Sequence, residues 1–467
     1  MKLKNLPSKD LAFLQKIGAL AESEQTDVYV VGGYVRDLLL KKPCRDVDFV
    51  VVGDGPEFAR KAREALNGHG YVVYPKFGTA SFIKDDYKLE FVSARKESYR
   101  ADSRKPQVEQ SDLTDDLARR DFTVNTLAMP VRRKHFGKIV DDYHGTKDLK
   151  KQVIRTPLDP KTTFSEDPLR IMRAARFASQ LHFKIDPKTL EAMRSERHRL
   201  EIVSQERISD EMLKMLSHPK PSIGFQILQD TGVLEIIFPE LAILEGVEQR
   251  DDFHHKDVFE HTLKVLDNIA QLTDDPLLRF TALVHDIGKP KTKRFVKGTG
   301  WTFHGHELAG MRMLKDLTIR LKLPNDYYKY SEKLTRLHMR PIQLIGEEVT
   351  DSAIRRLLAE AGDDLENLMT LCRADITSGN PDRVKKHLNN FDYVTQRMEE
   401  VEEKDKMRAF QSPVRGEEIM QILGTNPGPL IGQIKKRIEE AILEGEIPND
   451  YDAAHAYLLK IKDDYIK

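Results

Sequence analysis

Apolar and polar positions follow one period in the first third of the chain and another period in the rest. Up to about residue 150, short runs rich in β-branched residues, such as 27–31 and 47–52, alternate with stretches of helical spacing. Beyond residue 160, nearly every segment has the period of an amphipathic helix. The pattern predicts an α+β fold, in which a mixed α/β head precedes a mostly α-helical body.

Within the head, the pattern predicts further strands and two helices, the second of which is opened by Gly55 and Pro56. The polar stretch between Ala94 and Asp112 has little periodicity, and we expect a mobile loop there, either functional or simply disordered. The other elements are expected at 71–74, 80–84 and 89–93 for the strands and at 34–40 and 57–66 for the helices.

Length and composition narrow the class of protein. A chain of 467 residues is too long for one ordinary core, so two to four domains are expected. The formal net charge is zero, so an RNA partner would be held by local basic patches. Cys44 and Cys372 are the only cysteines, which suits a reducing compartment. The start of the chain lacks an apolar signal core and no run approaches the roughly 18 apolar residues of a membrane span, so we expect a cytoplasmic protein without a membrane partner.

The strongest candidate site begins where the first strand ends, at Gly32 and Gly33. Glycines let backbone N–H groups approach phosphate oxygens, and Arg36 adds a charged fork. Asp46 and Asp48 open the next strand and share one face at a period of two, which suits divalent metal. A plain turn and a solvated strand edge would look similar. The order of strand, turn, short helix and acidic strand favours a nucleoside triphosphate site.

Other polar residues of the head are candidates for the same site. Glu90 could supply a third carboxylate, although a solvent-facing acid is an equal alternative. We expect a helix to begin near Ser111 and to carry Arg120, Asp121 and Asn125 on its last turns. These side chains could hold phosphate and ribose hydroxyls, or they could form a surface salt-bridge cluster.

A further charged group follows Ser165, which we interpret as the N-cap of a helix. Arg170, Arg173 and Arg176 recur every three residues along one side of that helix, one turn after Asp167. Asp167 and Arg170 together offer acceptor and donor atoms that can imitate a base-pairing edge. The alternative is an ion pair within the helix, which contributes only a few tenths of a kcal/mol.

Taken in this order, residues 25–215 resemble the class II tRNA nucleotidyltransferases, that is, the CCA-adding enzymes and their poly(A) polymerase relatives in the polymerase-beta-type superfamily. The segment 203–208 matches the neck of that family. The resemblance implies that Asp46 and Asp48 are catalytic and hold two Mg²⁺ ions. It implies a nucleotide-binding role, with the base selected by Asp167 and Arg170, for Gly32, Gly33, Arg36, Arg120, Asp121, Asn125, Asp167, Arg170, Arg173 and Arg176.

Histidines gather in the helical body, where seven of the fifteen lie at 254–338. The pair His285-Asp286 ends an apolar helix expected at 277–284. The arrangement resembles the HD phosphohydrolase superfamily, whose four ligands to a divalent metal would here be His261, His285, Asp286 and Asp375. Imidazole and carboxylate ligands leave the identity of that metal open. His306 and His338 could bind a second ion or be structural.

The resemblance implies template-independent addition of CCA to the 3′ end of tRNA from CTP and ATP, with release of pyrophosphate. The polar stretch after Arg95 matches a loop that such enzymes need to change from C to A addition. The HD domain implies a possible phosphohydrolase activity on damaged RNA ends. Two alternatives stay open, namely a poly(A) polymerase and an HD phosphohydrolase whose head only binds nucleotide.

The resemblance also suggests a division of the chain. The basic run 289–297 contains an aromatic residue and could contact RNA, although such runs are more often merely solvated. A turn at 424–429 indicates the entry to a final helix pair. The expected parts are an N-terminal helix (1–25), the nucleotidyltransferase head (26–155), a helical neck (156–245), the HD domain (246–390) and a C-terminal helical tail (391–467).

Overall fold

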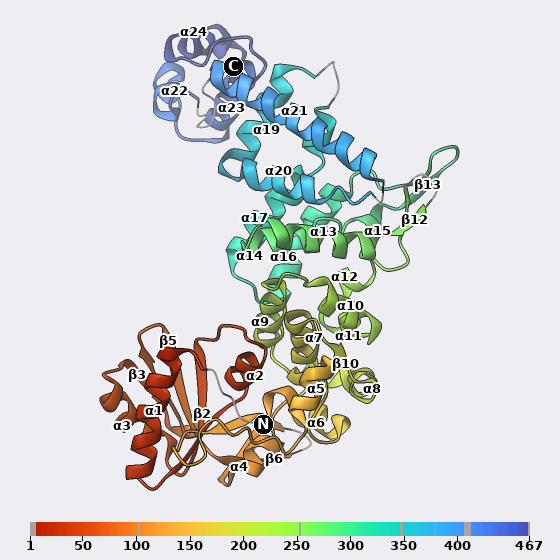
Figure 1. Cartoon of the computed structure of the whole chain (residues 1–467). Helices are drawn as coiled ribbons and strands as arrows, with labels where there is room; N and C mark the ends of the chain where they lie inside the picture. Colours follow the sequence, from red (N-terminus) through yellow and green to blue (C-terminus); the bar gives the residue numbers. More distant parts are fainter. Residues whose placement is uncertain are drawn as a thin grey trace. The chain divides into compact units, whose positions relative to one another are not determined.

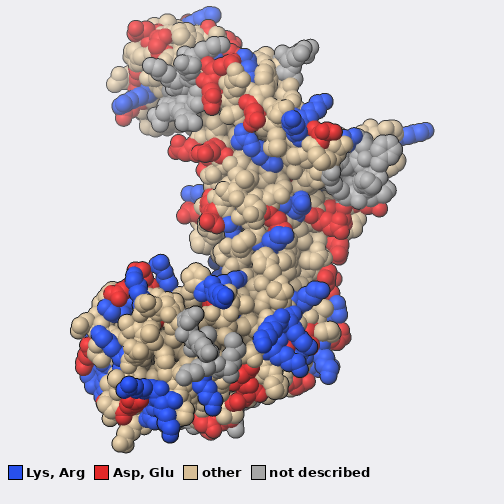
Figure 2. All heavy atoms as spheres, in the orientation of Figure 1, with Lys and Arg blue, Asp and Glu red and all other residues tan. Residues whose placement is uncertain are grey.

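The computed structural model describes residues 6–100, 103–251, 254–345, 349–378, 380–405 and 412–465 (Figure 1). The side chains of 96–108, 110, 249–256 and 402–405 lie outside this description. The chain divides into two compact units, Met1–Pro239 and Glu240–Lys467. None of the described helices combines the length and the apolar character that a membrane crossing requires. Acidic and basic side chains are interspersed over both units (Figure 2), in keeping with a formal net charge of zero.

The first unit contains a six-stranded sheet with the order β3-β4-β5-β2-β1-β8. Its central strand β2 pairs antiparallel with β1 and parallel with β5. The strands are β1 (Asp27–Val31), β2 (Asp46–Val52), β3 (His69–Tyr74), β4 (Thr79–Lys84), β5 (Tyr87–Ser93) and β8 (Ala128–Pro130). The expected strands are therefore confirmed, and β1 has the expected bounds because β-branched residues favour the extended backbone up to the glycine pair.

The two faces of this sheet differ in character. Helices α1 (Ser8–Ser23) and α3 (Gly55–Leu66) cover one face, into which alternate residues of β2 such as Phe49 point. Because side chains alternate along a strand, Asp46 and Asp48 point to the other face. That face is covered by a smaller apolar cluster, which includes Leu117 of α4 (Leu113–Ala118).

The stretch after Ala94 corrects one expectation. Its residues form an antiparallel hairpin of β6 (Arg95–Arg100) and β7 (Ser103–Gln110) instead of an irregular loop. A two-stranded ribbon is held by backbone hydrogen bonds, so it needs no apolar period that a sequence pattern would reveal.

Two expected helices also have different bounds. Helix α4, with Asp112 as N-cap, ends at Ala118, and a 3₁₀ turn (Thr123–Asn125) follows it. Ser165 is not an N-cap but lies inside α6 (Pro160–Glu166), and the next helix is α7 (Leu169–Leu181). Pro168 explains this break, because a proline disfavours helical backbone at the residue before it.

The remaining elements of the first unit are short helices and a small parallel strand pair. They are α2 (Gly33–Leu39), α5 (Gly145–Lys151), β9 (Val153–Ile154), β10 (Lys184–Ile185), α8 (Pro187–Glu196), α9 (Gln205–Leu216), α10 (Ser222–Asp230) and α11 (Val233–Ile237). Helix α12 (Pro239–Ala242) begins at the last residue of this unit, and its other residues belong to the second.

The second unit is mostly helical, with two small hairpins, β11 (Glu248–Asp251) with β12 (His254–Asp257) and β13 (Arg294–Val296) with β14 (Gly300–Thr302). Its C-terminal helices pack around a core of their own, and α23 and α24 form the final helix pair expected from the sequence. The helices are α13 (Val258–Leu272), α14 (Pro276–Val284), α15 (Lys289–Thr292), α16 (His306–Arg320), α17 (Asn325–Leu337), α18 (Arg340–Gln343), α19 (Asp351–Ala361), α20 (Leu365–Ala374), α21 (Pro381–Asp405), α22 (Gly416–Leu423), α23 (Pro429–Leu443) and α24 (Tyr451–Ile461).

Candidate nucleotide and metal sites

Three carboxylates gather on one face of the central sheet. Asp48 lies opposite Glu90 in the parallel pairing of β2 with β5, so both side chains point the same way. Burial, Glu90 and Asp46 raise the pKa of Asp48, whereas Arg120 lowers it. Carboxylates that repel one another in this way fit a divalent cation. Their oxygens are less tightly grouped than those of the second unit, and Glu90 is 3.3 Å from the Lys88 ammonium.

The glycine turn comes close to this face. Gly32 has a φ of 70° and precedes α2, and a Cβ placed on it would lie 2.8 Å from Nη1 of Arg120 and 3.9 Å from Oδ2 of Asp48. A glycine is therefore required at this position both for its backbone conformation and for the space that the arginine occupies.

We expect Gly32→Ala to reduce nucleotide binding at the head at least tenfold, because the methyl group would displace Arg120 and strain the turn by about 1–3 kcal/mol. Gly432→Ala on α23 is the matched control, since its Cβ would meet no atom within 4 Å and its φ is not positive. Equilibrium binding of ATP and CTP by calorimetry measures both variants. Equal affinities for the two variants would contradict the prediction.

A chain of hydrogen bonds joins residues that are far apart in sequence. Nη1 of Arg36 donates to Oδ1 of Asn125 at 2.7 Å, and Nδ2 of Asn125 donates to Oδ1 of Asp121 at 2.9 Å. Nε and Nη2 of Arg173 donate to Oδ2 of Asp121 at 2.8 and 2.5 Å. The structure thus brings together four of the predicted nucleotide-binding residues from α2, the segment 121–125 and α7.

Asp121 stays negatively charged within this hydrogen-bond network. Burial would raise its pKa, but Arg173 and Asn125 outweigh burial and lower the pKa to about 2. A carboxyl whose pKa is lowered in the folded state stabilises that state above its unfolded pKa, and the contribution disappears as the pH falls toward the folded pKa.

We therefore expect Asp121→Asn to lower the free energy of unfolding by about 2 kcal/mol at pH 7. The difference from the native protein should shrink as the pH falls from about 4 to about 2. Urea unfolding followed by circular dichroism across this pH range measures the effect. Asp86→Asn, on an exposed turn of the same sheet, is the control and should show no such trend. A constant difference for Asp121→Asn at all pH values would refute the account.

The other two arginines of α7 also contact neighbouring elements. The buried guanidinium of Arg170 donates to the carbonyl oxygen of Arg119 at 2.6 Å, and Nε of Arg176 donates to Oε2 of Glu211 on α9 at 2.6 Å. The sequence had suggested that Asp167 and Arg170 lie on one helix. In the structure, Asp167 lies at the C-terminal end of α6, whereas Arg170 belongs to α7. The predicted base-imitating pair thus comes from the junction of two helices.

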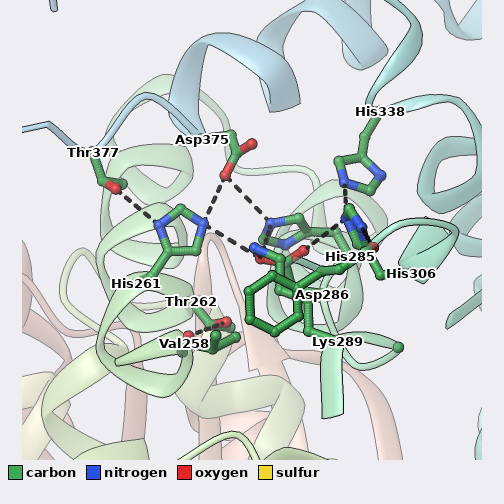
Figure 3. Close-up of polar contacts among 12 residues, drawn as sticks. Val258, His261, Thr262, His285, Asp286, Lys289, His306, His338, Asp375 and Thr377 are labelled. Carbon is green, nitrogen blue, oxygen red and sulfur yellow. Dashed lines mark hydrogen bonds and ion pairs between the residues drawn. The ribbon is translucent and has the colours of Figure 1, made fainter. Parts of the chain in front are cut away.

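In the second unit, six predicted metal-ligating side chains meet at the ends of helices (Figure 3). His285, His338 and Asp375 each follow directly on the last residue of a helix, namely α14, α17 and α20. His261 comes from the buried face of α13, and His306 begins α16. The side chains of His254 and His255 lie outside the described residues.

Three of the histidines are oriented by the same local contact. Nδ1 of His285, His306 and His338 faces a backbone carbonyl oxygen three residues earlier, at 2.9, 2.9 and 2.6 Å respectively. A carbonyl only accepts hydrogen bonds, so Nδ1 carries a proton in each ring, and Nε2, which points inward, is the nitrogen left to bind a metal. This is the tautomer of a metal-binding histidine.

The inward atoms form two groups that share Asp286. His261, His285 and Asp286 make one group, and Asp286, His306 and His338 make the other, with the ligand atoms of each group within 4.8 Å of one another. Oδ1 of Asp375 adds to the first group, because it lies 2.8 Å from Nε2 of His261. The structure therefore places His306 and His338 next to the four ligands predicted for the HD site, through the shared Asp286.

Unsatisfied atoms at the centre fit metal binding. Nε2 of His285, Oδ1 of Asp286 and Oδ1 of Asp375 are buried and make no well-aligned hydrogen bond with a described residue, although each lies 2.8–3.4 Å from another atom of the centre. Nε2 of His306 and Nε2 of His338 lie 3.2 Å apart, so two neutral rings would point lone pairs at each other. Cations would satisfy all of these atoms at once.

The ionisable side chains of this centre shift one another's pKa values. Burial would lower the pKa of His285, but Asp286 and Asp375 outweigh burial and raise the pKa to about 10. Burial and the neighbouring His285 lower the pKa of His338 to about 4. The carboxylate-rich side thus attracts positive charge, whereas His338 on the other side presents a neutral nitrogen ligand.

A cavity of about 570 Å³ opens beside the centre and is lined by Asp286, His306, His338 and Asp375. The sequence interpretation missed two residues at its edge. The buried Lys289 donates to Oδ2 of Asp286 at 2.6 Å, and Oγ1 of Thr377 lies 2.8 Å from Nδ1 of His261. Each lies two or three residues after a predicted ligand, which is the signal that could have identified it.

Comparison with known proteins identifies the parts of the chain. Three family models match, described as "Poly A polymerase head domain" (residues 28–155), "Probable RNA and SrmB- binding site of polymerase A" (182–244) and "HD domain" (258–380). The chain therefore combines a nucleotidyltransferase head of the poly(A) polymerase type with an HD domain.

Similar proteins extend the match to nearly the whole chain. The A-adding tRNA nucleotidyltransferase of Deinococcus radiodurans is 32% identical over 91% of this chain and 93% of its own length. The Multifunctional CCA protein of Methylococcus capsulatus is 36% identical over 74% of this chain and 81% of its own. The chain belongs to the tRNA nucleotidyltransferase family, as the sequence motifs predicted.

A solved structure supports the fold. The CCA-adding enzyme of Bacillus stearothermophilus, determined in complex with CTP, matches 98% of this chain and 99% of its own with a TM-score of 0.65 and 23% identity. The α+β fold predicted from the sequence, a mixed α/β head followed by a mostly helical body, is confirmed.

Proposed function

We propose that the protein adds CCA to the 3′ end of tRNA without a template, from CTP and ATP and with release of pyrophosphate. The observation that carries this proposal is the series of hydrogen bonds from Arg36 through Asn125 and Asp121 to Arg173, which joins α2, the helix that follows the glycine turn, to α7. Relatives named Multifunctional CCA protein support the same activity.

The acidic face of β2 is the proposed catalytic centre. Asp46 and Asp48, with Glu90 as a neighbour, would hold Mg²⁺, which supplies charge stabilisation at the phosphates and lowers the pKa of the attacking hydroxyl. Arg120 lies beside Gly32 and contributes positive charge where the triphosphate would lie. The 3′-hydroxyl of the RNA attacks the α-phosphate, and pyrophosphate leaves.

The nucleotide is proposed to lie between the glycine turn and α7. Gly32, Gly33 and Arg36 would contact phosphates, and Asp121 and Asn125 would contact the ribose. The base would meet Asp167 and Arg170 at the junction of α6 and α7. Arg173 and Arg176 would hold α7 in place through their carboxylate partners.

Extension of a tRNA that lacks its 3′ CCA tests this proposal. With CTP and ATP together, we expect addition of two C residues and one A, and no further growth, on a sequencing gel. Long A tails would instead identify a poly(A) polymerase and overturn the proposal.

A second candidate function is A addition alone. It is favoured by the relative from Deinococcus radiodurans, which is named for A addition and which this chain matches over 91% of its length. The same assay separates the two functions, because an A-adding enzyme would extend tRNA ending in CC and would leave tRNA lacking all three residues unchanged.

For the second unit, we propose metal-dependent hydrolysis of phosphate esters at RNA ends. Two divalent cations would share Asp286, one with His261, His285 and Asp375 and the other with His306 and His338. When bound, such cations generate a hydroxide nucleophile at neutral pH. The cavity beside the cations would admit the ester, and Lys289 would keep Asp286 oriented.

A further inference from the structure

One basic segment of the second unit, formed by α15 and the β13–β14 hairpin, has a composition that neither proposed reaction uses. Residues 289–302 contain four lysines, one arginine and no acidic residue, although the whole chain has a formal net charge of zero. Lys289 pairs with Asp286. The other four cations form no ion pair with any described carboxylate: Lys291, Lys293, Arg294 and Lys297.

The same hairpin exposes an aromatic pair. Phe295 and Trp301 lie directly opposite each other in the pairing of β13 with β14, so their side chains share one face of the ribbon. Their rings are 5.3 Å apart in an edge-to-face arrangement, with 66% of Phe295 and 37% of Trp301 exposed. An aromatic surface of this kind exposes apolar area to water, which calls for a partner.

Positive charge lies beside these rings. Nζ of Lys293 is 4.4 Å from the centre of the Trp301 ring, and Arg294 precedes Phe295. Figure 2 shows Lys and Arg side chains at the tip of the hairpin whose strand β13 is labelled in Figure 1. Aromatic rings interleaved with unpaired cations are the surface on which single-stranded nucleic acids stack their bases and place their phosphates.

The hairpin leads directly to the metal centre. Trp301 lines the cavity of about 570 Å³, as does the chain that follows it up to the predicted ligand His306. The indole therefore belongs both to the exposed aromatic pair and to the wall beside the metal-binding side chains.

We propose that the β13–β14 hairpin binds a single-stranded RNA end by stacking bases on Phe295 and Trp301, and directs that end into the cavity. Lys293, Arg294 and Lys297 contact the phosphates. The assignment of RNA rests on the proposed function of the protein, whereas the stacking surface follows from the hairpin itself. A protein partner is disfavoured, because Lys293 beside Trp301, with Arg294 and Lys297 on the same hairpin and no acidic residue among 289–302, matches a polyanion.

Tryptophan fluorescence tests this proposal directly, because Trp301 is the only tryptophan of the chain. Titration of the full chain with a single-stranded RNA of six uridines should quench the emission to saturation. With three phosphates contacted, the logarithm of the association constant should fall with the logarithm of salt concentration with a slope of about −2.

Variants identify the surface. Phe295→Ala should weaken binding at least about fivefold, since stacking on one ring is lost. Lys293→Gln with Arg294→Gln should weaken it further and flatten the salt dependence. Lys435→Gln with Lys436→Gln on α23 removes the same charge elsewhere and should leave the titration unchanged. No quenching at low salt, or equal affinities for all variants, would overturn the proposal.

Hydrolysis of a small phosphate ester distinguishes the proposal that the hairpin binds RNA from the proposal that the metal centre is a hydrolase. Hydrolysis of bis(p-nitrophenyl) phosphate needs the metal centre but not the hairpin, so the hairpin variants should retain it. If the native protein binds the RNA but does not hydrolyse the ester, the hydrolase proposal fails and the RNA-binding hairpin stands. Quenching by DNA of the same length with equal affinity would overturn the assignment to RNA.

Discussion

Replacement of Asp48 with asparagine is expected to reduce nucleotide addition by at least about 10³-fold, because the variant loses a charged metal ligand where phosphate charge must be stabilised. The asparagine has the same shape and can still accept a hydrogen bond. The loss would therefore reflect charge and metal binding and not a change in packing. Extension of tRNA under single-turnover conditions measures the rate.

Stability provides an independent measurement for this variant. Burial, Glu90 and Asp46 raise the pKa of Asp48, so its charge is held against repulsion in the folded protein. Removal of that charge should leave the melting temperature unchanged or raise it, whereas a merely structural role predicts a lower melting temperature. Asp86→Asn, at an exposed position of the same sheet, serves as the control and should retain full activity. An active Asp48→Asn variant would refute the proposed catalytic centre.

Replacement of Asp286 with asparagine is expected to abolish metal binding and ester hydrolysis in the second unit. Asp286 belongs to both groups of ligands, and its carboxylate also faces Lys289. Breaking such a buried pair by removing one partner costs about 3–5 kcal/mol, so this variant should also unfold more readily. Metal content by mass spectrometry and hydrolysis of bis(p-nitrophenyl) phosphate are the measurements.

A milder variant keeps this prediction testable if the Asp286→Asn protein folds poorly. His338→Gln removes a ligand of one group only, so we expect it to lose about one metal ion per chain and to retain the other. His304→Gln changes another histidine that lines the cavity but belongs to neither group, and it should retain both ions. Identical metal content in all three variants would contradict the proposed arrangement. Addition of nucleotides to tRNA should be unaffected throughout.

The tRNA nucleotidyltransferase family, the α+β fold and most element positions followed from the sequence. Strand β1 and helix α3 were predictable because β-branched runs, glycine and proline act through short-range sterics on neighbouring residues. The β6–β7 hairpin was not predictable, since backbone pairing between polar strands leaves no apolar period. The sequence-based prediction of one continuous helix missed the break before α7, although Pro168 in the sequence indicates such a break.

The sequence by itself determined which residue types were available for each site and the local backbone that carries them, such as the glycine turn before α2 and the HD pair after α14. Only the tertiary structure decided which of them meet. The parallel pairing of β2 with β5 places Glu90 beside Asp48, and the packing of α14, α16 and α17 brings His306 and His338 to Asp286. Local patterns depend on neighbours along the chain, whereas these contacts depend on the register and packing of elements separated by tens of residues.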